Sequence, residues 1–188
     1  MRQSCAQALG QEALFRGLST MKRLAAFGAR GEVLAASGTA VAVGVILFFS
    51  LPVVGGHLID QMYGYSYDRL MAVLADYGER GRRVHLLATA TLDLAFPVAY
   101  VLFFAGLVER LSGRASSLIL VPAVLGAVDL CENAHILAIL ALYPRVPRLL
   151  VASASCFTVL KHGLTLFVLL VVARLAWKRV RGFPAEPG

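Results

Sequence analysis

Charged residues are scarce in this chain: they make up 15% of the sequence, whereas hydrophobic residues make up 59%. With 188 residues and a mean hydropathy of +0.74, the chain has more apolar surface than a soluble domain of this size can bury. No Asp, Glu, Lys or Arg occurs from Val33 to Ile59, a longer run than a soluble core helix requires. We therefore expect an integral membrane protein.

The motifs of several large function classes are also missing. The three cysteines, Cys5, Cys131 and Cys156, have no CxxC spacing, which argues against a thiol-redox enzyme. Phosphate-binding loops, nucleophile elbows and nucleic-acid-binding motifs do not occur. The net charge of +7 does not indicate a nucleic-acid partner, because the basic residues lie at the ends of apolar segments. There they contact anionic headgroups, so the expected partner is the lipid bilayer.

Four apolar segments are long enough to cross a bilayer, since each has 19 residues or more and a helix rises about 1.5 Å per residue. We predict an all-α polytopic membrane protein with four transmembrane helices in one bundle. The expected domain is 36–176, preceded by a partly helical lead-in at 1–35 and followed by a tail at 177–188. The predicted spans are 36–54, 84–108, 117–142 and 150–173.

The distribution of Lys and Arg predicts the topology. Eleven of them lie on the side of the termini (five before the first span, two in the second loop, four from Arg174 onward), against six in the other two loops. The positive-inside rule then places both termini in the cytoplasm, in a multi-pass protein of the inner membrane. The first apolar run is longer than that of a signal peptide, so we expect it to be retained. Met21 is an alternative start site.

The first loop contains the pattern of a short amphipathic helix from Tyr67 to Tyr77, with Ser66 and Gly78 in cap positions. We expect this helix to lie at the membrane interface and to cover the bundle. Its apolar residues share one side: Leu70, Met71, Val73, Leu74 and Tyr77. The tyrosines of the loop suit the outer boundary, with rings in lipid and hydroxyls in water: Tyr63, Tyr65, Tyr67 and Tyr77.

Ionisable residues inside the predicted spans are the strongest functional signal, because each costs about 2.5 to 3.5 kcal/mol at the centre of a membrane helix. Asp93 lies in the second span, Asp129 and Glu132 in the third, and Lys161 in the fourth. Counted from the outer ends of their spans, Asp93, Glu132 and Lys161 have similar depths. We therefore predict one shared cluster inside the bundle.

Neighbouring residues extend this cluster into a pocket with an aromatic lining. Pro97 has no N–H to donate to the carbonyl of Asp93, so the second span should kink and that carbonyl needs a polar partner. Helical periodicity places one stripe on the third span, namely Pro122, Gly126, Asp129, Glu132 and Asn133. A second stripe lies on the fourth span, namely Ala154, Phe157, Thr158, Lys161 and Thr165. The predicted ligand- or proton-binding residues are Asp93, Tyr100, Asp129, Glu132, Asn133, His135 and Lys161.

The charge count of the cluster decides between functions. One lysine can neutralise one of the three acids, so the others must be protonated, pair with a histidine cation, or meet a bound cation. Our leading hypothesis is binding or transport of a proton, a cation or an amphipathic small molecule. One alternative is a membrane-embedded lipid or sterol-type isomerase that uses the carboxyl groups as acid and base. Another is a structural or assembly protein whose cluster only fixes helix register.

No metal or cofactor is expected. Asp129, Glu132 and His135 have Glu-x-x-His spacing, but a di-iron bundle needs a second such motif, and Lys161 would repel a metal cation. We expect His135 on the pocket rim. A bis-histidine haem site needs matched histidines on facing helices, and His162 lies about 100° from Lys161, off the polar stripe.

Two further expectations concern partners and family. Small residues on the first span favour close helix contacts, either within the bundle or in a homodimer: Gly38, Ala40, Ala42 and Gly44. Four helices, a long first loop and acids in the outer half form a layout similar to the sterol-binding and sterol-isomerising EXPERA proteins. The first span has no acid and no motif corresponds residue by residue, so we assign no family.

Overall fold

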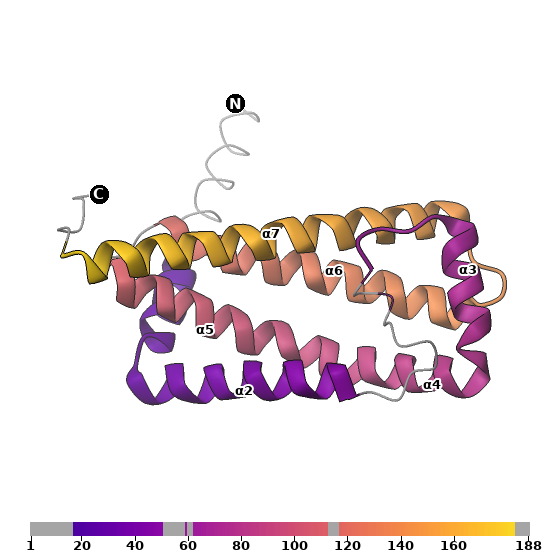
Figure 1. Cartoon of the computed structure of the whole chain (residues 1–188), viewed down its shortest axis with the longest axis horizontal. Coiled ribbons are helices and arrows are strands. Elements are labelled where there is room, and N and C mark those ends of the chain that lie inside the picture. Colours follow the sequence, from indigo (N-terminus) through magenta and orange to yellow (C-terminus); the bar gives the residue numbers. More distant parts are fainter. Residues whose placement is uncertain (1–16, 51–58, 60–61, 113–116, 183–188) are drawn as a thin grey trace, which may run out of the picture.

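The computed structural model describes residues 17–50, 59, 62–112 and 117–182. Four long helical stretches run side by side through it (Figure 1). All four are long and apolar enough to cross a membrane, which confirms the prediction of an all-α polytopic bundle. They comprise residues Gly31–Ser50, Gly78–Ser112, Ser117–Leu142 and Arg148–Val180.

The ends of the helices differ from the predicted spans by several residues. The first long helix, α2 (Gly31–Ser50), begins five residues before the predicted span, and the last four predicted residues, 51–54, lie outside the described part. The last helix, α7 (Arg148–Val180), continues well beyond residue 173. Lys178 and Arg179 lie in its final turn, where positive side chains interact favourably with the helix dipole.

The second transmembrane stretch is continuous but not uniform. It consists of α4 (Gly78–Ala88), a π-helical turn η2 (Thr89–Asp93) and α5 (Leu94–Ser112), with Pro97 inside α5. The third stretch is a short 3₁₀ turn η3 (Ser117–Ile119) followed by α6 (Leu120–Leu142). A π-turn just before a proline marks the one place where the regular hydrogen-bond ladder of the second stretch is interrupted.

Helix α5 is the centre of the bundle, because α2 and α6 both pack along it, and α7 packs on α6 and on α5. Within the described residues, α2 makes no comparable contact with α7. Gly38 and Gly44 set the distance between α2 and α5: an added Cβ would lie 2.9 Å from the ring of Phe103 and 2.6 Å from the ring of Phe96. These two glycines therefore serve packing inside the chain, whereas a homodimer stays a prediction.

The amphipathic helix expected in the first loop is α3 (Tyr67–Asp76), which crosses one end of the bundle (Figure 1). Ser66 caps it by accepting a hydrogen bond from the backbone N–H of Arg69 at 3.3 Å. Leu70 and Leu74 are fully buried and pack with the ends of α6 and α7. Arg82 on α4 donates to the carbonyl of Leu74 at 2.8 Å, which satisfies the last turn of α3.

Two of the loop tyrosines differ from the prediction of a membrane-boundary position. Tyr65 and Tyr77 are buried in the cluster beneath α3, because the loop folds back onto the bundle. The backbone of Tyr65 is fixed there by a 2.9 Å hydrogen bond to the hydroxyl of Ser155 on α7. Gly78 has φ +61°, a left-handed conformation that suits glycine at the turn between α3 and α4.

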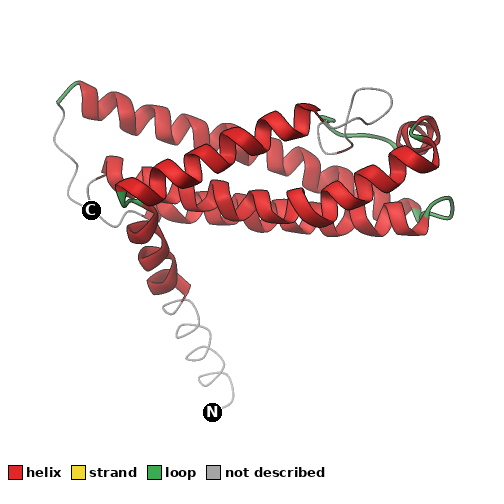
Figure 2. Ribbon diagram, turned by 90° about the horizontal axis from the view of Figure 1, so that it is seen from below, coloured by secondary structure: helices red, strands yellow, loops and turns green. Residues whose placement is uncertain are grey.

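At the other end of the bundle, residues 17–28 form a helix that leaves the bundle at a steep angle (Figure 2). Its last residue, Gly28, lies against Gly106 of α5 so closely that neither position has room for a Cβ. Ala25 is fully buried beside Ala105 and Val108 of α5. This part of the predicted lead-in is thus helical and packed on the protein.

Candidate functional site

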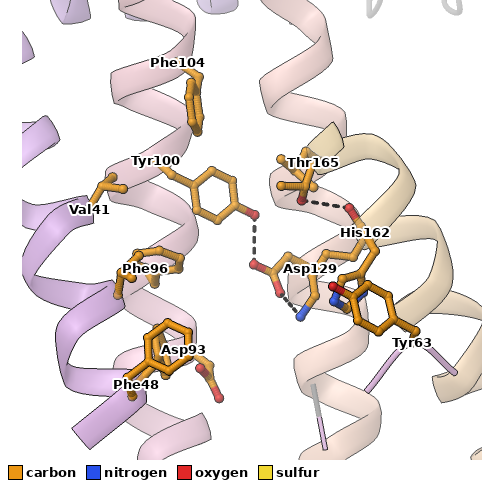
Figure 3. A pocket seen from close by; sticks show the side chains of 14 residues that line it. Val41, Phe48, Tyr63, Asp93, Phe96, Tyr100, Phe104, Asp129, His162 and Thr165 are labelled. Carbon is orange, nitrogen blue, oxygen red and sulfur yellow. Dashed lines mark hydrogen bonds and ion pairs between the residues drawn. The ribbon is translucent and has the colours of Figure 1, made fainter. Parts of the chain in front are cut away.

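A cavity of about 700 Å³ lies between α2, α5, α6 and α7 (Figure 3). This volume is within the range of pockets that hold small organic molecules. One wall is apolar and comes mainly from α2, through Val41, Val45, Phe48 and Phe49. The opposite wall carries the ionisable residues of α6 and α7, so the cavity is amphipathic from side to side.

Aromatic rings connect the apolar wall to the polar one. Phe48 and Phe96 meet edge to face with ring centroids 5.2 Å apart, and Phe96 meets Tyr100 in the same way at 5.4 Å. Phe96 and Tyr100 are one helical turn apart on α5, which places both rings on the cavity side (Figure 3). The aromatic series ends at the Tyr100 hydroxyl, which donates to a carboxylate oxygen of Asp129 at 2.9 Å.

Lys161 joins two of the acids on α6. Its ammonium nitrogen lies 2.6 Å from an oxygen of Glu132 and 3.5 Å from an oxygen of Asp129. Asp129 and Lys161 both line the cavity, whereas Glu132 is fully buried behind them. The other oxygen of Glu132 accepts a 2.6 Å hydrogen bond from the hydroxyl of Thr158, which lies one turn before Lys161 on α7.

Asp93 reaches the same cavity from the π-turn of the second stretch, and only 6% of it is exposed. Its backbone carbonyl accepts a 2.7 Å hydrogen bond from the side-chain amide of Asn133 on α6. Pro97 cannot donate to this carbonyl, so Asn133 supplies the polar partner that the sequence requires. Asn133 itself is buried outside the cavity lining, and its role in this structure is to join α6 to η2.

His135 differs from its expected place on the pocket rim. Its Nδ1 lies 2.7 Å from the carbonyl of Cys131 on its own helix, and its ring lies 5.0 Å from that of Phe157. The residue does not line the cavity. It lies one helical turn after Glu132, which is itself outside the lining, and its ring packs against Phe157 of α7. Among the described residues, no group of three His, Cys, Asp or Glu side chains is placed to hold a metal ion.

His162 lines the cavity, although the helical wheel placed it off the polar stripe. The cavity is wide enough to be bordered by two consecutive residues of α7, Lys161 and His162, and by Tyr63, whose ring lies 4.8 Å from the imidazole. His162 Nδ1 lies 2.7 Å from the carbonyl of Thr158. Because a carbonyl only accepts, Nδ1 carries a proton and donates it in this contact.

No family model matches the sequence, and no curated protein or solved structure shows significant similarity to the chain. The fold and the site define the class directly. It is a polytopic α-helical membrane protein with buried charged residues beside a cavity between its helices.

Proposed function

We propose that the protein binds an amphipathic cation that is dissolved in the bilayer. One observation carries this proposal: the carboxyl groups of Asp93 and Asp129 line a cavity whose other lining side chains are mostly aliphatic and aromatic. The cation would lie at the carboxyl groups and the apolar part along α2. Such a ligand matches both walls at once.

The charge balance favours a positive ligand. Asp93, Asp129 and Glu132 are acidic, and Lys161 is the one lysine or arginine among the described lining residues. Its closest carboxylate is Glu132, which does not reach the cavity. A ligand cation beside Asp93 and Asp129 offsets the acidic surplus where water is scarce.

The aromatic rings also favour a cation. The faces of Phe and Tyr rings attract ammonium groups, and quaternary ammonium ions are bound in this way by aromatic cages. Phe96 and Tyr100 line the cavity on the side of α5 that also carries Asp93. A trimethylammonium group could therefore touch both a ring and a carboxylate.

The rim of the cavity supports access from the hydrocarbon. Phe49 and Val45 line the cavity and are nevertheless 81% and 41% exposed on the outer surface of α2. Since α2 packs along α5 and not comparably along α7 in the described residues, the cavity borders the lipid-facing surface between α2 and α7. A ligand with an alkyl chain can reach such a rim without leaving the bilayer.

Binding can be tested with three probes that share a tail and differ in head charge. The full-length protein in lipid nanodiscs is titrated with decyltrimethylammonium, 1-decanol and decyl sulfate, and empty nanodiscs correct for partitioning. We expect the cation to bind most tightly, and Asp93→Asn and Asp129→Asn each to weaken it by about tenfold or more. Asp68→Asn, on the exposed face of α3, is the matched control. Equal binding of all three probes would refute the proposal.

A second candidate function is an isomerase that moves a proton within an apolar substrate. The observation in its favour is that Asp93 and Asp129 line the same cavity from different helices, with the Tyr100 hydroxyl donating to Asp129. Two carboxyl groups in different protonation states supply a proton donor and an acceptor. Lipid extracts of a deletion strain would then accumulate one unprocessed species, which simple binding does not predict. Full function of Asp93→Asn would instead favour a cluster that only fixes helix register.

We also propose that both termini face the cytoplasm in the inner membrane. Eight described basic residues belong to the segments at the end of the bundle opposite α3, against six at the α3 end; the eight are Lys22, Arg23, Arg30, Arg110, Arg174, Lys178, Arg179 and Arg181. This is the arrangement that the positive-inside rule associates with the cytoplasmic side. Reporter fusions at the C-terminus and in the first loop should lie on opposite sides of the membrane. Activity of both fusions on one side would overturn the assignment.

A further inference from the structure

We propose that Lys161 is a built-in competitor for the cation site: without a ligand its ammonium group contacts both Asp129 and Glu132, and it keeps only Glu132 when a ligand cation binds Asp129. This inference rests on the proposed binding of a cation. It assigns different roles to two carboxylates that are one helical turn apart on α6. Asp129 is the exchangeable counter-ion, and Glu132 is a positioning residue.

The distances support this division of roles. Lys161 Nζ is 2.6 Å from Glu132, a direct charge-assisted contact, but 3.5 Å from Asp129, longer than a strong hydrogen bond. The short contact lies on the buried side and the long contact on the cavity side. A ligand cation arriving through the cavity therefore meets the weaker of the two contacts first.

Both carboxylates are fixed by hydroxyl groups from other helices, whereas the lysine is attached by a flexible stem. Tyr100 on α5 donates to Asp129 at 2.9 Å, and Thr158 on α7 donates to Glu132 at 2.6 Å. Each hydroxyl bonds the carboxylate oxygen that Lys161 does not approach. The acids can thus stay in place while the lysine ammonium moves away from Asp129 and keeps its contact with Glu132, because its four-carbon side chain is flexible and its charge is compact.

The two sides of this ion pair should then have opposite effects on cation affinity. Lys161→Gln removes the competitor and keeps a hydrogen-bond donor beside Glu132, so a ligand cation binds Asp129 more tightly. Glu132→Gln removes the alternative partner of Lys161, so the lysine stays with Asp129 and the ligand binds more weakly. If the ion pair only stabilised the bundle, both substitutions would weaken binding.

The test titrates decyltrimethylammonium into nanodiscs that contain the full-length protein or a variant. We expect Lys161→Gln to tighten binding and Glu132→Gln to weaken it, each by about tenfold, which is the effect of roughly one charge contact. Lys178→Gln, near the far end of α7, and Glu79→Gln, exposed on α4, are the matched controls and should leave affinity unchanged. Thermal unfolding in detergent shows that each variant is folded.

If Glu132→Gln alone does not fold, the double variant with Lys161→Gln replaces it, because removing both partners of the short ion pair avoids leaving one of them buried without the other. The double variant should bind the cation more tightly than the wild type, as Lys161→Gln does. The competitor role would be overturned if both single variants changed the affinity for decyltrimethylammonium in the same direction, or if the double variant bound it more weakly than the wild type. Cation binding itself would still stand. If neither the wild type nor Lys161→Gln binds the cation, the proposed function fails and the competitor role fails with it.

Discussion

The hydrogen bond between Asn133 and the carbonyl of Asp93 offers a quantitative test of the structure. Asn133→Leu, a change of similar volume, leaves that carbonyl without its donor in a buried place where Pro97 cannot replace it. A buried polar group without a partner costs about 1 to 3 kcal/mol, and hydrogen bonds between membrane helices contribute up to about 2 kcal/mol. We therefore expect the free energy of unfolding to fall by about 1 to 2 kcal/mol.

The dependence on Pro97 makes this prediction specific. Pro97→Ala restores a backbone N–H four residues after Asp93, so the carbonyl regains an intrahelical donor. Asn133→Leu should then be at least about 1 kcal/mol less destabilising in the Pro97→Ala background, a coupling that a double-mutant cycle measures. The assay is reversible unfolding in mixed micelles with increasing denaturing detergent, with Ala134→Leu on the exposed face of α6 as the control. The same loss of stability in both backgrounds would refute the reasoning.

Three further predictions concern packing, capping and the cavity wall. Gly44→Ala should lower the stability of the bundle by about 1 to 3 kcal/mol in the same unfolding assay, because its Cβ would lie 2.6 Å from the ring of Phe96. Ser66→Ala removes the cap of α3 and should cost about 0.5 to 1 kcal/mol, seen as faster hydrogen exchange of α3 alone. His162→Ala should weaken decyltrimethylammonium binding, whereas His135→Ala should leave it unchanged, since only His162 lines the cavity. Equal effects of the two histidines would contradict the described cavity.

Two properties of the site were local enough to be read from the sequence. Burying a charge in a membrane is expensive at any position, so the sequence alone predicts that Asp93, Asp129 and Lys161 form a cluster inside the bundle. The missing N–H of Pro97 is equally local, and it predicted an unsatisfied carbonyl at Asp93 four residues earlier. The structure adds that Asn133 is the donor, a choice that depends on how α6 is rotated against α5.

The helices themselves were determined by the sequence alone, because the length and hydropathy of an apolar run decide whether it can cross a bilayer. Tertiary packing decided which side chains share the cavity. A helical wheel gives the angles between side chains within one helix. The rotation of each helix in the bundle depends on its neighbours, as at the close approach of Gly44 to Phe96 and where α6 packs on α7. For that reason Glu132 is hidden behind Lys161 and His162 lines the cavity, since both outcomes depend on neighbours that lie far away in the sequence.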